Sequence, residues 1–101
     1  MLISVCREDY PNLRVIASMA ADEMLNLNGI TAAFVLYRAE DKVYLSARSF
    51  GEVNVQIIAE KLGGGGHATV AGAQLDTTDF GEAFEILKNA INDYEKENRK
   101  D

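Results

Sequence analysis

Apolar residues recur along the chain at two different spacings, which predict helices and strands in alternation. The first helical stretch is expected to start at Pro11, with Asp9 as a possible cap, because proline is favoured in the first turn of a helix. Asn28-Gly29 provides a left-handed stop for this helix. The apolar positions at helical spacing are Leu13, Ile16, Ala17, Ala20, Met24 and Leu27.

Strand-like stretches flank this helix. Residues 1–6 predict a short strand, and residues 30–37 and 43–50 predict the two arms of a hairpin joined through Glu40-Asp41-Lys42. Side chains alternate between the two faces of a strand. Arg48 and Ser46 are therefore expected to project on the same side of the second arm. One face of this arm carries Val43, Leu45 and Ala47, and the other carries Tyr44, Ser46, Arg48 and Phe50.

The second half of the chain predicts two further helices. Asn54 is expected to cap a helix whose apolar stripe is Val55, Ile58, Ala59 and Leu62, and Gly63 is expected to end it. Residues 68–72 are interpreted as a short helical turn and residues 73–77 as a strand. Asp79 and Glu82 resemble a capping box at the start of the last helix. Its inward residues are Phe80, Ala83, Leu87, Ile91 and Tyr94.

The order of elements is thus β-α-β-β-α-(short α)-β-α, which predicts an α/β domain built on one mixed sheet. The length of 101 residues fits a single domain over residues 1–101, with residues 96–101 as a frayed, charged tail. No apolar run approaches the roughly 18–20 residues that a membrane span needs. Cys6 is the only cysteine, which excludes an internal disulfide and favours a reducing cytoplasm.

The formal net charge of −6 limits the kind of partner that is expected. A protein that binds long nucleic acid usually carries a basic face, and lysine and arginine are spread thinly here. Any phosphate must therefore be bound by a few local groups. We expect a small ligand and no contact of this domain with long nucleic acid or with a membrane.

The run Gly63-Gly64-Gly65-Gly66-His67 is the most unusual local feature of the sequence. Glycines lose more backbone entropy on folding than other residues, so the run needs a reason. Successive backbone N–H groups in such a loop can form a concavity for an anion, and His67 can add a donor. A flexible turn after the helix is the alternative. The loop lacks the Gly-Lys-Ser/Thr of a P-loop and the third glycine of the dinucleotide fingerprint.

The sequence offers no visible centre for cleavage chemistry. With one histidine and one cysteine, a zinc or dinuclear site built from these residues cannot be assembled. The acidic residues are scattered, and Asp22-Glu23 is interpreted as a solvated helix face. No Gly-x-Ser-x-Gly elbow is present to accompany His67.

Two longer strings of residues carry a family resemblance. Ser46-Ala47-Arg48-Ser49-Phe50-Gly51-Glu52-Val53-Asn54-Val55-Gln56, followed by Glu60-Lys61-Leu62-Gly63-Gly64-Gly65-Gly66-His67, resembles the DHH-associated domain of DHH-family phosphoesterases. The Gly-Gly-Gly-His signature is shared across that superfamily. The longer string is narrower and is similar to the membrane-anchored bacterial cyclic di-AMP phosphodiesterases.

The resemblance implies that two domains form the active site together. The metal ions, usually manganese, would lie in a separate N-terminal domain with an Asp-His-His motif that is absent here. This domain would bind no cofactor itself and would hold a cyclic or linear dinucleotide across a cleft from that partner domain. The substrate phosphate would be contacted by Gly64, Gly65, Gly66, His67 and Arg48, with Asn54 lining the cleft and Ser46 and Ser49 as weaker candidates. His67 and Arg48 would also offset charge in the transition state.

One departure from the subgroup keeps other functions open. After His67, the segment Ala68-Thr69-Val70-Ala71-Gly72 is closer to the general superfamily pattern than to the subgroup's Thr-Asn-Ala-Ala. Short linear oligonucleotides, a RecJ-like exonuclease role and a non-catalytic nucleotide-binding module are therefore alternatives. The resemblance implies a cytoplasmic domain whose parent protein is anchored in the bacterial membrane, and a homodimer is possible.

Overall fold

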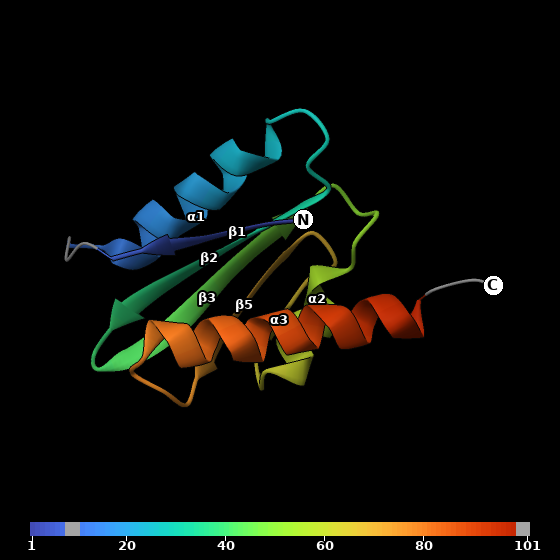
Figure 1. Cartoon of the computed structure of the whole chain (residues 1–101). Coiled ribbons are helices and arrows are strands. Elements are labelled where there is room, and N and C mark those ends of the chain that lie inside the picture. Colours follow the sequence, from blue (N-terminus) through green and yellow to red (C-terminus); the bar gives the residue numbers. More distant parts are fainter. Residues whose placement is uncertain (8–10, 99–101) are drawn as a thin grey trace.

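A five-stranded sheet forms the centre of the computed structural model, which describes residues 1–7 and 11–98 (Figure 1). The strand order is β1-β2-β3-β5-β4. β1 runs parallel to β2 and the other neighbours are antiparallel, so the sheet is mixed as predicted. The strands are β1 (Leu2–Cys6), β2 (Ala32–Ala39), β3 (Lys42–Ser49), β4 (Gly65–Gly66) and β5 (Val70–Leu75).

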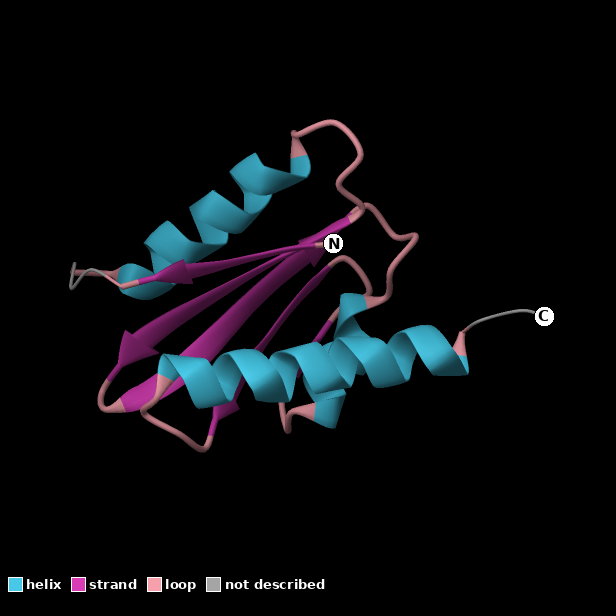
Figure 2. Cartoon of the chain, in the orientation of Figure 1, coloured by secondary structure: helices cyan, strands magenta, loops and turns pink. Residues whose placement is uncertain are grey.

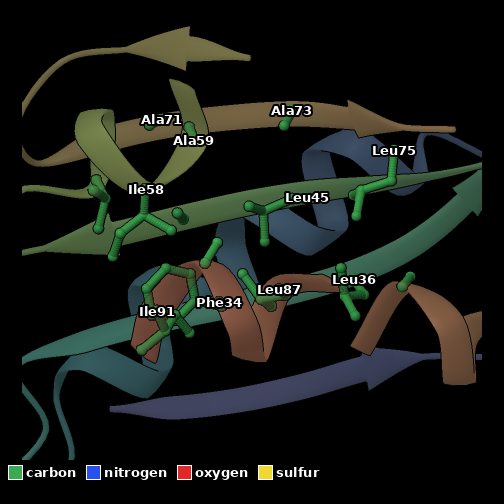
Figure 3. Close-up of a cluster of buried hydrophobic side chains, with 14 of the residues drawn as sticks. Phe34, Leu36, Leu45, Ile58, Ala59, Ala71, Ala73, Leu75, Leu87 and Ile91 are labelled. Atoms are coloured by element: carbon green, nitrogen blue, oxygen red, sulfur yellow. The ribbon is translucent and has the colours of Figure 1, made fainter. Parts of the chain in front are cut away.

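The three helices cover both faces of this sheet (Figure 2). α1 (Leu13–Leu25) packs over β2 and β3 on one face, while α2 (Val55–Lys61) and α3 (Phe80–Glu97) lie on the other. Successive side chains of β2 point to opposite faces of the sheet, so its buried residues are divided between the two helix layers. Phe34 and Leu36 meet Leu87 and Ile91 of α3 and Ile58 of α2 (Figure 3). Full burial of each large side chain contributes about 1.5–3 kcal/mol.

Small side chains bring α1 close to the sheet. Ala17 and Ala21 are fully buried, and they pack with Leu13 and Leu25 against Ala33, Val35 and Tyr37. The predicted apolar stripe was partly wrong, because Ile16 is exposed and Leu27 lies beyond the helix end at Leu25. Close packing selects the alanines over the larger Ile16. The helix begins after Asn12, which has a left-handed conformation, and the proposed cap at Asp9 lies outside the described residues.

The hairpin between β2 and β3 closes through a tight turn at Glu40 and Asp41. Both residues have positive φ, 51° and 62°. Two such residues in succession characterise the type I′ turn, whose twist matches that of the flanking strands. The predicted turn is confirmed, although glycine and asparagine fit this conformation better.

The region after the glycine run differs from its prediction. Residues 68–72 do not form a helical turn, because β4 and β5 pair as antiparallel strands with Gly65 opposite Gly72 and Gly66 opposite Ala71. β5 begins at Val70, three residues before the predicted strand. Pairing with β3 explains this early start, since Arg48 lies opposite Val70.

Asp79 caps α3 as predicted, but only half of the proposed capping box forms. The Asp79 carboxylate accepts from the backbone N–H groups of Gly81 and Glu82. The backbone N–H of Asp79 donates to the Thr77 hydroxyl, which takes the place of the Glu82 side chain. α3 continues through Lys96 and Glu97, so the predicted fraying does not begin at residue 96, and residues 99–101 lie outside the described part.

Candidate functional site

A groove of about 550 Å³ lies on the face of the sheet that carries α1. α1 packs over β2 and β3, while Val70 and Gln74 of β5 remain exposed on the open part of this face. One wall is α1 and the other is the glycine loop. The lining residues used below are Arg14, Ser18, Tyr37, Tyr44, Ser46, Arg48, Gly65, Gly66, His67, Val70, Gly72 and Gln74.

The floor of the groove is lowest where small residues align across three strands. Ser46 of β3 lies opposite Gly72 of β5, which in turn lies opposite Gly65 of β4. Because Ser46 has a small side chain and Gly72 and Gly65 have none, this row forms a trough between the larger side chains on either side. Arg48 stands on one side of this row, and Tyr44 stands on the other, two residues away along β3.

Arg48 is held in place by the elements around it. Its side chain is only 14% exposed, Nε lies 3.2 Å from Oδ1 of Asp22 on α1, and Nη1 donates to the Ala47 carbonyl at 2.9 Å. The prediction that Arg48 shares a face with Ser46 is confirmed. Asp22 lies on a solvated helix face, as the sequence predicted, and is 65% exposed while it also pairs with Arg48. Among the described residues, none forms a hydrogen bond with Nη2 of Arg48.

The first half of the glycine run ends α2. The Gly63 N–H donates to the Glu60 carbonyl at 3.1 Å, and the Gly64 N–H donates to the Ala59 carbonyl at 2.8 Å. With φ of 83° at Gly63, these bonds form a Schellman motif. The expected concavity of successive free N–H groups is therefore reduced, because the first two N–H groups of the run serve the helix end.

The other three glycines of the run differ in whether the surrounding chain leaves room for a side chain. A Cβ on Gly64 would overlap the Gly72 carbonyl oxygen, and one on Gly66 would overlap that of Val70. Gly66 also has a φ of 144°. At Gly65, a Cβ would meet nothing within 4 Å, and the residue has no positive φ. Packing within the described chain thus explains Gly64 and Gly66 but not Gly65.

His67 begins the tight connection between β4 and β5. Its backbone N–H donates to the Val70 carbonyl at 2.6 Å, and the Val70 N–H returns a bond of 3.3 Å to the His67 carbonyl. The residue is exposed and lines the groove beside Gly66. A fixed backbone therefore presents a side chain that can turn toward a ligand.

The structure places three predicted residues, Gly64, Ser49 and Asn54, outside the groove lining. Ser49 is buried, and its hydroxyl donates to the carbonyls of Val53 and Ala68 and accepts from the Gly51 N–H. Asn54 caps α2, because its Oδ1 accepts from the N–H groups of Gln56 and Ile57. Through these hydrogen bonds, Ser49 and Asn54 hold the local backbone and do not line the groove. Their contact with substrate stays a prediction.

Sequence reasoning missed the residues that α1 and β2 contribute to the site. Arg14 and Ser18 line the groove, and Asp22 reaches Arg48. Their spacing of four residues is the signal that was available, since such residues share one helix face. Ser18 Oγ lies 3.4 Å from Ser46 Oγ and so connects this face to the trough.

Metal ligands are not grouped in this site. Residues 1–7 and 11–98 contain no cluster of three or more His, Cys, Asp or Glu side chains that could hold an ion. The groove residues therefore do not fit a resident manganese ion. In the same described ranges, no helix is long and apolar enough to cross a membrane.

Basic side chains gather along the groove although the chain is acidic. Arg14, Arg48 and His67 line it together with one acidic residue, Glu40, in a protein with a net charge of −6. A trough with exposed glycine backbone, a guanidinium and an imidazole matches the needs of a phosphate group. Fold and site together define an α/β domain with a groove, lined by glycine backbone and basic side chains, at the open edge of its sheet.

Comparison with known proteins assigns this domain to a family. The sequence matches the DHHA1 domain over residues 2–96, and the chain belongs to this family. It is 50% identical over 82 residues to the cyclic-di-AMP phosphodiesterase GdpP of Geobacillus thermodenitrificans, covering 80% of this chain and 12% of that protein. It is 46% identical over 97 residues to the cyclic-di-AMP phosphodiesterase PdeA of Listeria monocytogenes, covering 95% of this chain and 15% of that protein. The predicted resemblance is confirmed.

A solved structure supports the fold. An exopolyphosphatase-related protein from Bacteroides fragilis superposes with a TM-score of 0.74 over 92% of this chain and 29% of that one, at 18% identity. This likeness concerns the fold alone. The chain spans 12–15% of the two curated relatives, so their complete activities include parts that lie outside it.

Proposed function

We propose that this chain is the substrate-binding part of a phosphodiesterase that hydrolyses cyclic di-AMP to the linear dinucleotide. Two relatives that are about half identical to it bear the name cyclic-di-AMP phosphodiesterase. The groove supplies a suitable place for a phosphodiester, between the loop Gly65–His67 and Arg48.

The observation that carries the proposal is the open face of Gly65. Gly64 and Gly66 are required by close backbone contacts, whereas a Cβ at position 65 would meet no atom of the described chain within 4 Å. Gly65 lines the groove in the same row as Ser46 and Gly72. Close approach of a ligand to the backbone is the remaining reason for glycine there.

Arg48 and His67 act on the phosphate from two directions. A guanidinium offers several N–H donors in a planar fork, and in Arg48 the Asp22 and Ala47 contacts engage Nε and Nη1 while Nη2 remains available. The His67 imidazole adds a donor from the opposite wall. Donors fixed before the reaction stabilise charge as it develops on the phosphoryl oxygens.

Bond cleavage requires groups beyond this chain. Because the described residues hold no metal cluster, we expect the manganese centre implied by the family resemblance to lie in a separate domain. Membrane anchoring of a parent protein would likewise come from outside these residues. The role of this domain is to bind and orient the phosphodiester. The 101 residues alone are expected to show no turnover of cyclic di-AMP with manganese.

Calorimetric titration tests this role. Cyclic di-AMP, its linear dinucleotide and AMP are each titrated into the chain. Millimolar binding that is lost in Arg48→Ala and His67→Ala, but kept in the charge control Lys88→Ala on α3, supports one half of a composite site. Micromolar binding would instead indicate a non-catalytic nucleotide-binding module. Unchanged binding in both groove variants would overturn the site assignment.

Activity in the complete protein provides the second measurement. Arg48→Ala and His67→Ala are expected to lower turnover by orders of magnitude while the circular dichroism spectrum is kept. A complete protein that cleaves short linear oligonucleotides but leaves cyclic di-AMP intact would establish the alternative substrate class.

A further inference from the structure

The end of the groove away from Arg48 is aromatic. Tyr37 of β2 and Tyr44 of β3 lie opposite each other and stack, with ring centroids 5.6 Å apart and an interplanar angle of 18°. Both line the groove, as do Arg14 of α1 and Gln74 of β5. Gln74 is the cross-strand partner of Tyr44 on β5, the neighbour of β3 on the side away from β2.

The stack has one covered end and one open end. Tyr37 is only 4% exposed and covers the Tyr44 face toward β2, whereas Tyr44 itself is half-buried. β5 lies on the other side of β3, where Gln74 is the cross-strand partner of Tyr44. On that strand Gly72 has no side chain and Gln74 is exposed, and both line the groove beside Tyr44.

Burial favours the neutral form of the inner tyrosine even in alkaline solution. Desolvation raises the pKa of Tyr37 above its ordinary value, and the nearby Arg14 charge and the Ser46 hydroxyl offset this only in part. The stacked pair therefore offers a planar aromatic surface in the groove. Aromatic side chains of this kind stack with nucleobases, and each stacked base contributes about 1–3 kcal/mol.

We propose that this end of the groove is a nucleobase subsite, in which the open face of Tyr44 stacks on adenine and the Gln74 amide pairs with its edge. This inference rests on the proposed function, since it places the nucleoside attached to the phosphate at Arg48. A carboxamide can donate to N7 and accept from N6 of adenine, a pattern that guanine does not present. No described residue forms a hydrogen bond with the Gln74 side chain.

The dimensions of β3 fit this arrangement. Tyr44 and Arg48 are four residues apart, or about 13 Å along an extended strand, with Ser46 midway between them. A phosphate between Arg48 and Gly65 thus leaves the trough at Ser46 and Gly72 for the sugar. The base then reaches Tyr44.

Nuclear magnetic resonance titrations test the subsite independently of the phosphate site. Adenosine, which has no phosphate, is expected to shift the Tyr44 ring and Gln74 side-chain amide signals and to leave the Tyr94 ring on the far face unchanged. Ribose 5-phosphate is expected to shift the Gly65 and Gly66 amides instead. Absence of adenosine shifts at Tyr44 and Gln74 would overturn the subsite, whatever the loop shows. Absence of loop shifts would count against the phosphate site alone.

Affinities in variants sharpen the test. AMP is expected to bind more tightly than ribose 5-phosphate, and Tyr44→Leu is expected to weaken AMP binding about tenfold without affecting ribose 5-phosphate. Gln74→Ala is expected to reduce the preference for AMP over GMP about tenfold. Phe84→Ala, an aromatic control on α3, should change neither. Equal binding of AMP and ribose 5-phosphate to the unmodified chain would reject the subsite.

Discussion

Arg48 on β3 is tied to Asp22 on α1 by an ion pair in which Nε and Oδ1 lie 3.2 Å apart. The carboxylate is 65% exposed and the arginine side chain only 14% exposed, so the pair lies at the mouth of the groove with its cation inside. Asp22 therefore fixes the guanidinium and also partly neutralises it. An incoming phosphate must share Arg48 with this carboxylate.

Asp22→Asn should strengthen phosphate binding a few-fold, because it removes the negative charge beside Arg48 and keeps the side-chain size. The free energy of unfolding should fall by only about 1 kcal/mol, because the Asp22 carboxylate that is replaced is largely exposed. Titration with ribose 5-phosphate at low and high salt measures the effect. Weaker binding in Asp22→Asn would show that orienting Arg48 matters more than the charge.

Arg48→Lys should weaken phosphate binding about tenfold or more, since an ammonium group lacks the planar fork of a guanidinium. Lys88→Arg on α3 is the matched control and should bind normally. Retention of full affinity in Arg48→Lys would mean that Arg48 acts only as a point charge.

Gly65→Ala should separate binding from folding. A Cβ at this position meets no atom within 4 Å, so the unfolding temperature should be unchanged, while phosphate binding is lost. Gly64→Ala is the contrast, because its Cβ would overlap the Gly72 carbonyl and cost about 1–3 kcal/mol or more of unfolding free energy. Thermal denaturation and titration of both variants check this. Normal phosphate binding in Gly65→Ala would remove the main support for the phosphate site.

Asn54→Ala should lower the free energy of unfolding by about 1 kcal/mol, because the α2 cap to Gln56 and Ile57 is lost. Asn54→Asp keeps a capping oxygen and should retain the stability. Urea denaturation of the two variants measures this difference. If Asn54 also contacts phosphate, as the family resemblance implies, the added charge in Asn54→Asp will weaken binding without a loss of stability.

Tyr37→Phe should make the protein less sensitive to alkali. The pKa of Tyr37 is raised in the folded state, chiefly by burial, so its contribution to stability is complete below the ordinary value of 10.0 and is lost as pH rises through the raised pKa. Unfolding temperatures recorded from neutral to strongly alkaline pH should fall less steeply in the variant. The exposed Lys42 has a raised pKa as well, owing to its bond with Asp76, so Lys42→Arg provides the comparison. An identical decline in Tyr37→Phe and the unmodified chain would contradict the assignment.

Much of the fold followed from apolar spacing, and the exceptions have physical causes. The hairpin arms and the cap at Asn54 depend on local patterns, and the structure confirms them. The stripe of α1 was misplaced because close packing favours Ala17 and Ala21, which a ranking by hydrophobicity overlooks. The extra helical turn was wrong because pairing of Gly65 with Gly72 depends on contacts distant in sequence.

The candidate site was only partly visible in the sequence for a related reason. Arg48 and the glycine run could be identified from their own chemistry and their resemblance to a family. Asp22 and Gln74 acquire their positions from packing and strand register, which join segments far apart in the chain. Their residue types alone are ordinary for exposed positions.

The buried hydroxyl of Ser49 has a consequence for how the site opens. It bonds to the Val53 and Ala68 carbonyls, and the Ser49 backbone N–H donates to the Thr69 carbonyl at 3.0 Å. One residue thus fastens the end of β3, next to Arg48, to the turn that follows His67. Local unfolding at this point would release Arg48 and the turn that follows His67 together. Amide hydrogen exchange at residues 48–49 and 67–70 should therefore occur as one cooperative unit.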